Sequence, residues 1–154
     1  MKVFANIPER VVKTTVFEVI VILLIVLFLG TAADKWMDHE AFREGLRKSP
    51  FLTAYAGILS HAVPLAEVAT VTLLLFKRTV LWGLYAAVFL MSAFTSYIYA
   101  LLHYSYYVPC KCHAALESLT WEQHLLFNVI FLGLSTTGVI LKSRELNQFK
   151  TRFS

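Results

Sequence analysis

The sequence predicts an all-α membrane protein, a bundle of four transmembrane helices with a short interfacial helix in the first outer loop. Of its 154 residues, 58% are hydrophobic and only 16% are charged, and the mean hydropathy is +0.64. A soluble domain carries about a quarter charged residues, so this chain lacks the groups that face water. Apolar stretches near the ~20 residues that a helix needs to cross a bilayer occur at about 14–33, 51–76, 79–103 and 120–141. We expect one integral membrane domain over residues 1–154.

The first span, at about 14–33, has an unbroken aliphatic core from Val19 to Leu29. We expect no cleavable signal peptide here. The apolar region of a cleavable signal is about 7–15 residues long, and this one is longer. We therefore expect the segment to be retained as a helix, although Thr31-Ala32-Ala33 resembles a cleavage site.

The loop that follows, residues 34–50, carries the pattern of a short amphipathic helix. Phe42 and Leu46 are four residues apart, so a helix would place them on one face. Asp38 precedes the pattern and is a residue type that caps helix N-termini. We expect this helix to lie on the membrane with Trp36 in the interface.

The second span, at about 51–76, carries His61, Pro64 and Glu67, which are unusual residues for lipid surroundings. Proline removes one backbone hydrogen bond and can kink the helix. A charge near the bilayer centre costs at least ~2.5 kcal/mol, so Glu67 should face the bundle interior, be protonated or be paired. A functional carboxylate and a buried structural pair are both open for Glu67, as are a supporting role and a simple interfacial position for His61.

The third and fourth spans differ in the polar residues that they carry. The third offers small, weakly polar surface of the kind that lets neighbouring helices approach closely, at Ser92, Ala93, Thr95 and Ser96. The fourth begins with Thr120 followed three residues later by Gln123, which is a capping box. His124 and Asn128 are four residues apart and share one face of this helix. They either satisfy each other or line a site beneath the preceding loop.

The 14 basic residues are distributed unevenly about the predicted spans. Four spans put both termini on one side, and that side collects Lys2, Arg10, Lys13, Lys77, Arg78, Lys142, Arg144, Lys150 and Arg152. The opposite side has Lys35, Arg43, Arg47, Lys48 and Lys111. Because cytoplasmic loops carry the excess of basic residues, we expect both termini in the cytoplasm and the loop before the fourth span in the periplasm. The basic residues form no clustered stripe, so we expect no nucleic-acid partner.

Both cysteines of the chain, Cys110 and Cys112, lie in the loop between the third and fourth spans. Thiol exchange requires a thiolate and a second thiol that resolves the mixed disulfide, and this pair supplies both sulfurs. Lys111 and His113 place positive charge beside the thiols, which favours the thiolate. A bridge between positions two apart closes a very small ring, so we expect a strained, easily reduced disulfide. The sequence therefore predicts a catalytic pair, with supporting residues Lys111, His113, His124, Asn128, Glu67 and His61.

Two other interpretations of the cysteine pair stay open. The first is a pair of free thiols without a role. The second is a metal site in which Cys110, Cys112 and His113 take Cu(I) or Zn, since soft ligands favour these ions. Such a site would need a further ligand from among His103, His124 and His39.

At this point the chain resembles the MauE/DoxX-type redox-associated membrane proteins, in the form common in Bacteroidota. The resemblance covers about residues 12–141 and is most specific over 109–128. The residues that carry it are Asp34 and Phe42 in the first outer loop, the Pro-x-x-Glu at Pro64 and Glu67, and the cysteine loop leading into Leu-Thr-Trp-Glu-Gln-His-Leu-Leu-Phe-Asn.

The resemblance implies a four-helix bundle that carries out periplasmic thiol–disulfide work with a thioredoxin-like partner. MauE itself is associated with maturation of methylamine dehydrogenase, which has a disulfide-rich subunit. The chain is more loosely similar to the DsbB and vitamin K epoxide reductase oxidoreductases, which pass electrons to quinone, so a quinone acceptor is an expectation of the same kind. It departs from those enzymes in having Cys-x-Cys and one cysteine pair, which excludes a relay through two pairs. His113-Ala114-Ala115 after the second cysteine leaves room for a metal.

Three functions of different class are therefore expected. The first is an inner-membrane thiol–disulfide redox protein that exchanges disulfides with a periplasmic thioredoxin-like or substrate protein through Cys110 and Cys112. The second is a non-enzymatic accessory or assembly subunit that docks other envelope membrane proteins. The third is a copper-handling membrane protein.

Overall fold

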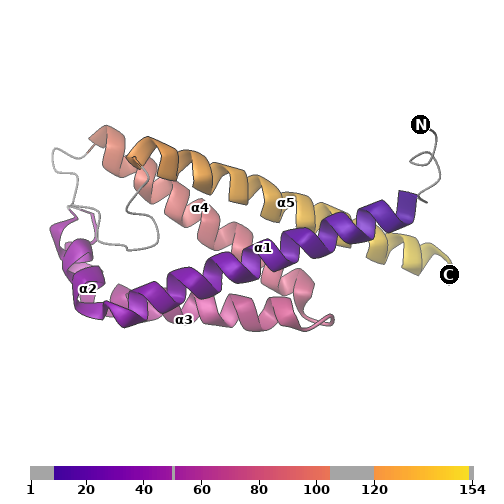
Figure 1. Cartoon of the computed structure of the whole chain (residues 1–154), viewed down its shortest axis with the longest axis horizontal. Coiled ribbons are helices and arrows are strands. Elements are labelled where there is room, and N and C mark those ends of the chain that lie inside the picture. Colours follow the sequence, from indigo (N-terminus) through magenta and orange to yellow (C-terminus); the bar gives the residue numbers. More distant parts are fainter. Residues whose placement is uncertain (1–8, 50, 105–119, 153–154) are drawn as a thin grey trace, which may run out of the picture.

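A computed structural model of the chain describes residues 9–49, 51–104 and 120–152. In chain order, the elements are α1 (Glu9–Met37), α2 (His39–Lys48), the short 3-10 helix η2 (Thr53–Tyr55), α3 (Ala56–Leu75), α4 (Val80–Tyr104) and α5 (Trp121–Arg152) (Figure 1). The predicted fold class is confirmed, because the described residues form four long apolar helices and one short helix.

The four long helices run alternately up and down, so both termini lie at one end of the bundle (Figure 1). Helix α1 packs against α3 and α5, and α4 packs against the same two helices. The other end of the bundle carries α2, the end of α4 at Tyr104 and the start of α5 at Trp121. Lys35 near the end of α1 and His124 near the start of α5 lie toward this end, whereas Glu67 lies past the middle of α3.

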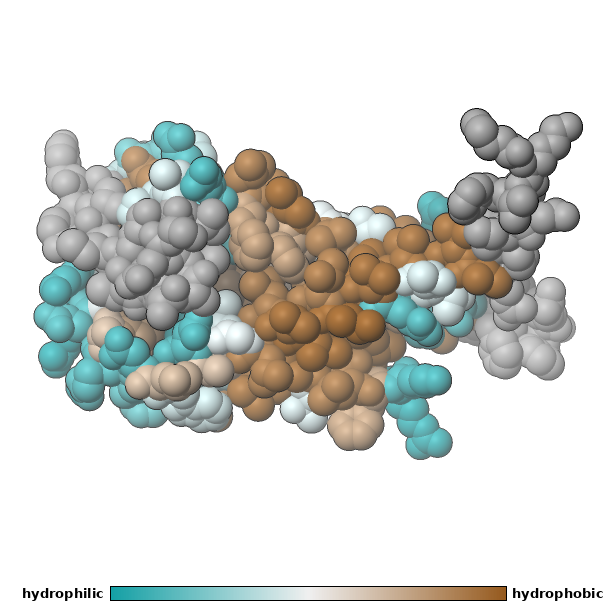
Figure 2. Space-filling model, in the orientation of Figure 1, coloured by the Kyte–Doolittle hydropathy of each residue, from teal (hydrophilic) through white to brown (hydrophobic). Residues whose placement is uncertain are grey.

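Each long helix is apolar enough over its length to cross a membrane. The apolar segments are Val11–Met37, Thr53–Leu75, Val80–Tyr104 and Trp121–Asn147. Large apolar side chains point outward from them, and Figure 2 shows a hydrophobic band across the middle of the visible face, with hydrophilic residues gathered at the end that carries α2. So wide an exposed apolar surface is unfavourable in water and favourable in the hydrocarbon core of a bilayer. The chain is a multi-pass membrane protein with these helices as its candidate spans.

The apolar core lies between the helices and follows a four-residue spacing on α1. Ile20, Leu24 and Phe28 are buried on successive turns and meet Leu74 of α3 and Leu84 of α4. Side chains four apart lie on one helix face, so this single row can line the bundle interior along most of α1. The same row leads directly to the polar residues of the candidate site.

Helix α2 confirms the predicted amphipathic pattern. Phe42 and Leu46 are both buried on one face, against Ala56 and neighbouring residues of α3. The predicted cap was wrong in one respect, because Asp38 occupies the cap position without donating or accepting a side-chain capping hydrogen bond. The apolar face of α2 packs against α3 through Phe42 and Leu46. Trp36, which precedes α2 in the chain, is exposed over 53% of its surface.

The turn between α3 and α4 depends on a glycine. A Cβ atom at Gly83 would lie 2.8 Å from the backbone nitrogen of Leu74 and 3.0 Å from the backbone carbon of Leu73. Backbone atoms cannot move aside as a side-chain end can, so any side chain here pushes the two helices apart. The close approach of α3 and α4 at this point therefore requires Gly83.

We expect Gly83→Ala to lower the free energy of unfolding by ~1–3 kcal/mol, the usual effect of overpacking a core. Gly133→Ala is the matched control, because a Cβ at Gly133 meets nothing within 4 Å. Removing the glycine there should leave stability unchanged or raise it by up to ~1 kcal/mol. Thermal unfolding of the two purified variants in the same detergent measures both effects. Equal stability of the two variants would contradict the close packing at Gly83.

Candidate functional site

Glu67 lies on the inner face of α3 and is fully buried, with 0% of its surface exposed. Its Oε1 atom accepts hydrogen bonds from Lys35 Nζ at 2.8 Å and from Thr31 Oγ1 at 3.1 Å. Both partners come from α1, where they are one turn apart. The expectation that Glu67 faces the bundle interior or is paired is confirmed, and both alternatives hold together. We call Thr31, Lys35 and Glu67 the charged cluster.

Lys35 links the charged cluster to α2 and α4 as well as to α3. Besides its ion pair with Glu67 of α3, Lys35 Nζ lies 5.7 Å from the ring centre of Phe42 of α2 and 5.7 Å from that of Phe94 of α4. Aromatic faces attract a desolvated ammonium group, so the two rings add to the attraction of the carboxylate. One lysine side chain of α1 thus contacts residues of α2, α3 and α4.

Two of the predicted site residues carry a buried polar atom that has no hydrogen-bond partner among the described residues. These atoms are Oε2 of Glu67 and Nδ2 of Asn128, which is 4% exposed. A buried polar atom without a partner costs about 1–3 kcal/mol, so such atoms are rare unless water or a bound group completes them. The site can accept one more donor at Glu67 and one more acceptor at Asn128.

The start of α5 is fixed as the sequence predicted. The Thr120 backbone N–H donates to Gln123 Oε1 at 2.8 Å, and the Gln123 N–H donates to Thr120 Oγ1 at 3.3 Å, which confirms the capping box. His124 is half-buried in the next turn, with its ring 6.2 Å from that of Trp121. No hydrogen bond joins the side chains of His124 and Asn128 in the described chain, so they do not satisfy each other.

The structure does not bring His61 to the charged cluster. Its side chain is exposed on α3, whereas that of Glu67 on the same helix is buried. The His61 ring packs against His39 of α2 with ring centres 4.5 Å apart, and its Nδ1 atom lies 3.2 Å from the Gly57 carbonyl oxygen. His103 is also exposed and stacks on Tyr99 at 4.2 Å. These contacts describe surface histidines.

Cys110, Lys111, Cys112 and His113 lie outside the described residues. The described residues on either side of this segment are Tyr104 and Thr120, and both lie at the end of the bundle that holds α2 (Figure 1). In the described ranges, no three His, Cys, Asp or Glu side chains gather closely enough to hold a metal. The histidines considered above as further metal ligands therefore belong to no group of three such side chains within those ranges.

Sequence reasoning missed Lys35 and Thr31, because Lys35 was assigned to the first outer loop. A signal for both was present. Leu24 and Phe28 continue at alternating spacings of three and four to Thr31 and then Lys35, which is the spacing of one buried helix face. Following the row past the end of the apolar run would have placed Lys35 inside the bundle, near the level of the acidic residue in α3.

Comparison with known proteins adds one finding to this geometry. A search of curated proteins and a search of solved structures found no match to the chain. The family model described as Methylamine utilisation protein MauE matches residues 13–141. That range includes α3, α4 and the cysteine segment in full, together with most of α1 and α5. With the resemblance to MauE confirmed over most of its length, the chain belongs to the MauE family of membrane proteins.

Proposed function

We propose that this protein is a thiol–disulfide redox protein of the bacterial inner membrane, with Cys110 and Cys112 as its catalytic pair. One observation carries the proposal: the segment that holds both cysteines joins the bundle at Tyr104 and Thr120, at the end from which Lys35 of α1 reaches the buried Glu67. A buried ion pair with an unpartnered oxygen is costly in a membrane, and such groups occur mainly where function requires them. Membership of the MauE family supports the same interpretation.

The proposed exchange proceeds through a mixed disulfide. A thiolate of the pair attacks one sulfur of a disulfide in a periplasmic partner, which is a thioredoxin-like or substrate protein, and the other partner sulfur leaves as a thiolate. The second cysteine then attacks the mixed disulfide. A Cys110–Cys112 disulfide forms, and the partner departs as a dithiol. The two electrons and two protons of the chain's dithiol pass to the partner, and the reverse reaction oxidises the partner.

Within this proposal, the supporting residues have separate parts. Lys111 and His113 stabilise the thiolate through their positive charge. His124 stands at the first turn after the cysteine segment and exchanges the proton, because imidazole is the side chain best suited to proton transfer near neutral pH. Glu67 and Asn128 each offer one buried polar atom to water or to a bound group. His61 is exposed on α3, and we place it at the membrane interface without a part in the exchange.

The orientation of the pair follows from the basic residues. The end of the bundle that holds both termini and the α3–α4 turn has the larger number of lysines and arginines, so we place it in the cytoplasm. The cysteine segment then faces the periplasm, a compartment in which disulfides form and persist.

We expect Cys110→Ser and Cys112→Ser single variants to differ in a trapping experiment. The variant that keeps the attacking thiol should accumulate a mixed disulfide with a periplasmic protein, because the resolving thiol is missing. The other variant and the double variant should accumulate none. Non-reducing gels and mass spectrometry of the captured species measure this result.

An impermeant thiol reagent applied to intact cells tests the orientation in the same variants. It should label the remaining cysteine while the inner membrane is intact. Labelling only after the membrane is opened, or full activity in the double serine variant, would contradict the proposed function.

One observation favours the accessory-subunit alternative. Ala93 and Ser96 are exposed on α4, and small residues on a membrane helix let a second protein approach closely. Stoichiometric co-purification of another envelope membrane protein, retained in the double serine variant, would support that function. The copper alternative is tested by metal analysis of the reduced protein after loading with Cu(I).

A further inference from the structure

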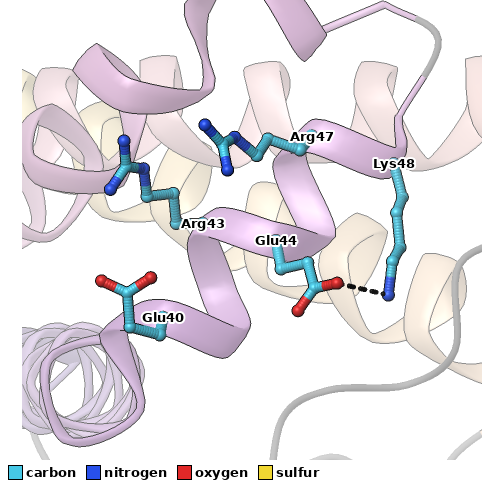
Figure 3. A pocket seen from close by; sticks show the side chains of 5 residues that line it. All are labelled: Glu40, Arg43, Glu44, Arg47 and Lys48. Atoms are coloured by element: carbon cyan, nitrogen blue, oxygen red, sulfur yellow. Dashed lines mark ion pairs between the residues drawn. The ribbon is translucent and has the colours of Figure 1, made fainter.

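The outer face of α2 carries a hollow that the proposed function does not use. It has a volume of about 260 Å3 and is lined by Glu40, Arg43, Glu44, Arg47 and Lys48 (Figure 3). All five residues come from α2, whose opposite face is buried against α3 through Phe42 and Leu46. The hollow therefore opens away from α3, and the helix that carries it packs against α3 on its opposite face.

Charge in this hollow is only partly balanced. Glu44 pairs with Lys48 at 3.1 Å, and Figure 3 shows the two guanidinium groups of Arg43 and Arg47 directed to another side of the helix. Across the described residues, neither arginine side chain forms an ion pair or hydrogen bond, with Glu40 or with any other group. Two neighbouring arginines that form no ion pair attract an anion. A planar guanidinium binds phosphate in a bidentate manner.

Arg43 gives a second, independent indication. Its Nε atom is buried and has no hydrogen-bond partner within the described chain. An unpartnered buried donor is unfavourable by about 1–3 kcal/mol, and the cost is larger for a charged group. An oxyanion resting against Arg43 would remove it. Arg43 therefore lacks both a hydrogen-bond acceptor at Nε and an ion-pair partner within the described chain.

The position of the hollow identifies the source of the anion. Trp36, Phe51 and Tyr55 lie next to α2 in the chain and are exposed over 53%, 47% and 61% of their surfaces. Exposed aromatic side chains at the end of apolar spans mark the headgroup region of a bilayer. A hollow built on one helix cannot enclose a free ion. A lipid phosphate, in contrast, is held at this depth by its own chains.

We propose that Arg43 and Arg47 form a binding site for the phosphate group of an anionic lipid headgroup. The lipid's phosphate accepts hydrogen bonds from both guanidinium groups, and its chains lie along the exposed apolar side chains of the bundle. Bound lipid fixes α2 at the membrane surface. This site is distinct from the cysteine pair and holds whichever function the pair performs.

The test uses the full-length protein in nanodiscs of phosphatidylcholine, with and without phosphatidylglycerol. Phosphatidylglycerol should raise the unfolding temperature and remain bound in native mass spectrometry. A basic residue at a membrane surface contributes ~1 kcal/mol, so Arg43→Gln should weaken lipid retention roughly fivefold, and Arg43→Gln with Arg47→Gln roughly 30-fold. Arg78→Gln is the matched control, since Arg78 is exposed at the opposite end of the bundle and should leave retention unchanged.

Glu40→Gln protects the test against a variant that fails to fold. It removes the negative charge beside the arginines and should strengthen retention of phosphatidylglycerol. Equal retention by the wild type and the double arginine variant would overturn the proposal, as would weaker retention by Glu40→Gln. If inorganic phosphate in neutral nanodiscs stabilises the protein as much as phosphatidylglycerol does, the site binds a free anion and the lipid assignment is wrong.

Discussion

Replacing Lys35 with methionine is expected to lower the free energy of unfolding by ~3–5 kcal/mol, the usual effect of removing one partner of a buried ion pair. The variant leaves Glu67 with 0% of its surface exposed and with Thr31 as its one remaining hydrogen-bond donor among the described residues. It also removes the charge that faces Phe42 and Phe94. Titration with a denaturing detergent, followed by circular dichroism, measures the loss.

The companion variant replaces both members of the pair. Lys35→Met combined with Glu67→Met leaves no charge in the interior, and apolar residues of similar volume often replace buried ion pairs at no loss. The double variant should therefore be at least as stable as the wild type. Glu145→Gln is the matched surface control, because Lys142 and Glu145 also lie 2.8 Å apart but Glu145 is 67% exposed. An exposed pair of this kind contributes ~0.2–1 kcal/mol.

The three variants separate a real ion pair from a coincidence of position. If Lys35→Met costs no more than Glu145→Gln, Lys35 does not neutralise Glu67 in the membrane. If the double variant is as unstable as Lys35→Met alone, the loss comes from packing around Lys35 rather than from an uncompensated carboxylate. Only a large single loss with recovery in the double variant agrees with the charged cluster.

The fold could be predicted from hydropathy because the four helices obey local rules. Each apolar run is long enough to cross lipid, and the capping box at Thr120 and the paired Phe42 and Leu46 are local patterns that the structure repeats. Helices α1 and α5 extend beyond the predicted spans. Helix α5 continues to Arg152, because polar helix-forming residues such as the Lys142–Glu145 pair prolong the helix after the apolar run ends. Hydropathy locates the lipid-facing part of a helix, and backbone hydrogen bonding sets its ends.

The candidate site was less predictable. The sequence singled out Glu67 because a carboxylate is conspicuous in an apolar run, and it predicted burial or pairing correctly. The buried row on α1 leads to Lys35, but its pairing with Glu67 could not be read locally, since the two residues lie 32 positions apart in the chain. Contacts between helices depend on how far each one is rotated, which periodicity constrains only loosely. His61 differs in this respect, because a spacing of six residues at 3.6 residues per turn already puts its side chain and that of Glu67 on different sides of α3.

The second large effect is expected at His124. Under the proposed function, His124→Gln should slow disulfide exchange with the periplasmic partner by ~100-fold at neutral pH, the lower end of what a positioned general base contributes. Glutamine keeps the size and polarity of the side chain but takes up no proton. The fold should be preserved, because the described contact of the His124 ring is its stacking on Trp121, while the helix start is held by the Thr120–Gln123 box. Stopped-flow measurement of exchange with a reduced or oxidised partner gives the rate.

His103→Gln is the matched control, since both histidines flank the cysteine segment at the same end of the bundle. His103 is exposed and stacks on Tyr99, away from the charged cluster, so its replacement should leave the rate within about twofold. The pH profile distinguishes proton transfer from a merely structural effect. Above the ordinary thiol pKa of ~8.5 the thiol ionises without help, so the rates of His124→Gln and the wild type should converge there. A rate deficit that persists unchanged at high pH would assign His124 to packing, whereas equal deficits in the two histidine variants would remove the distinction between the buried and the exposed ring.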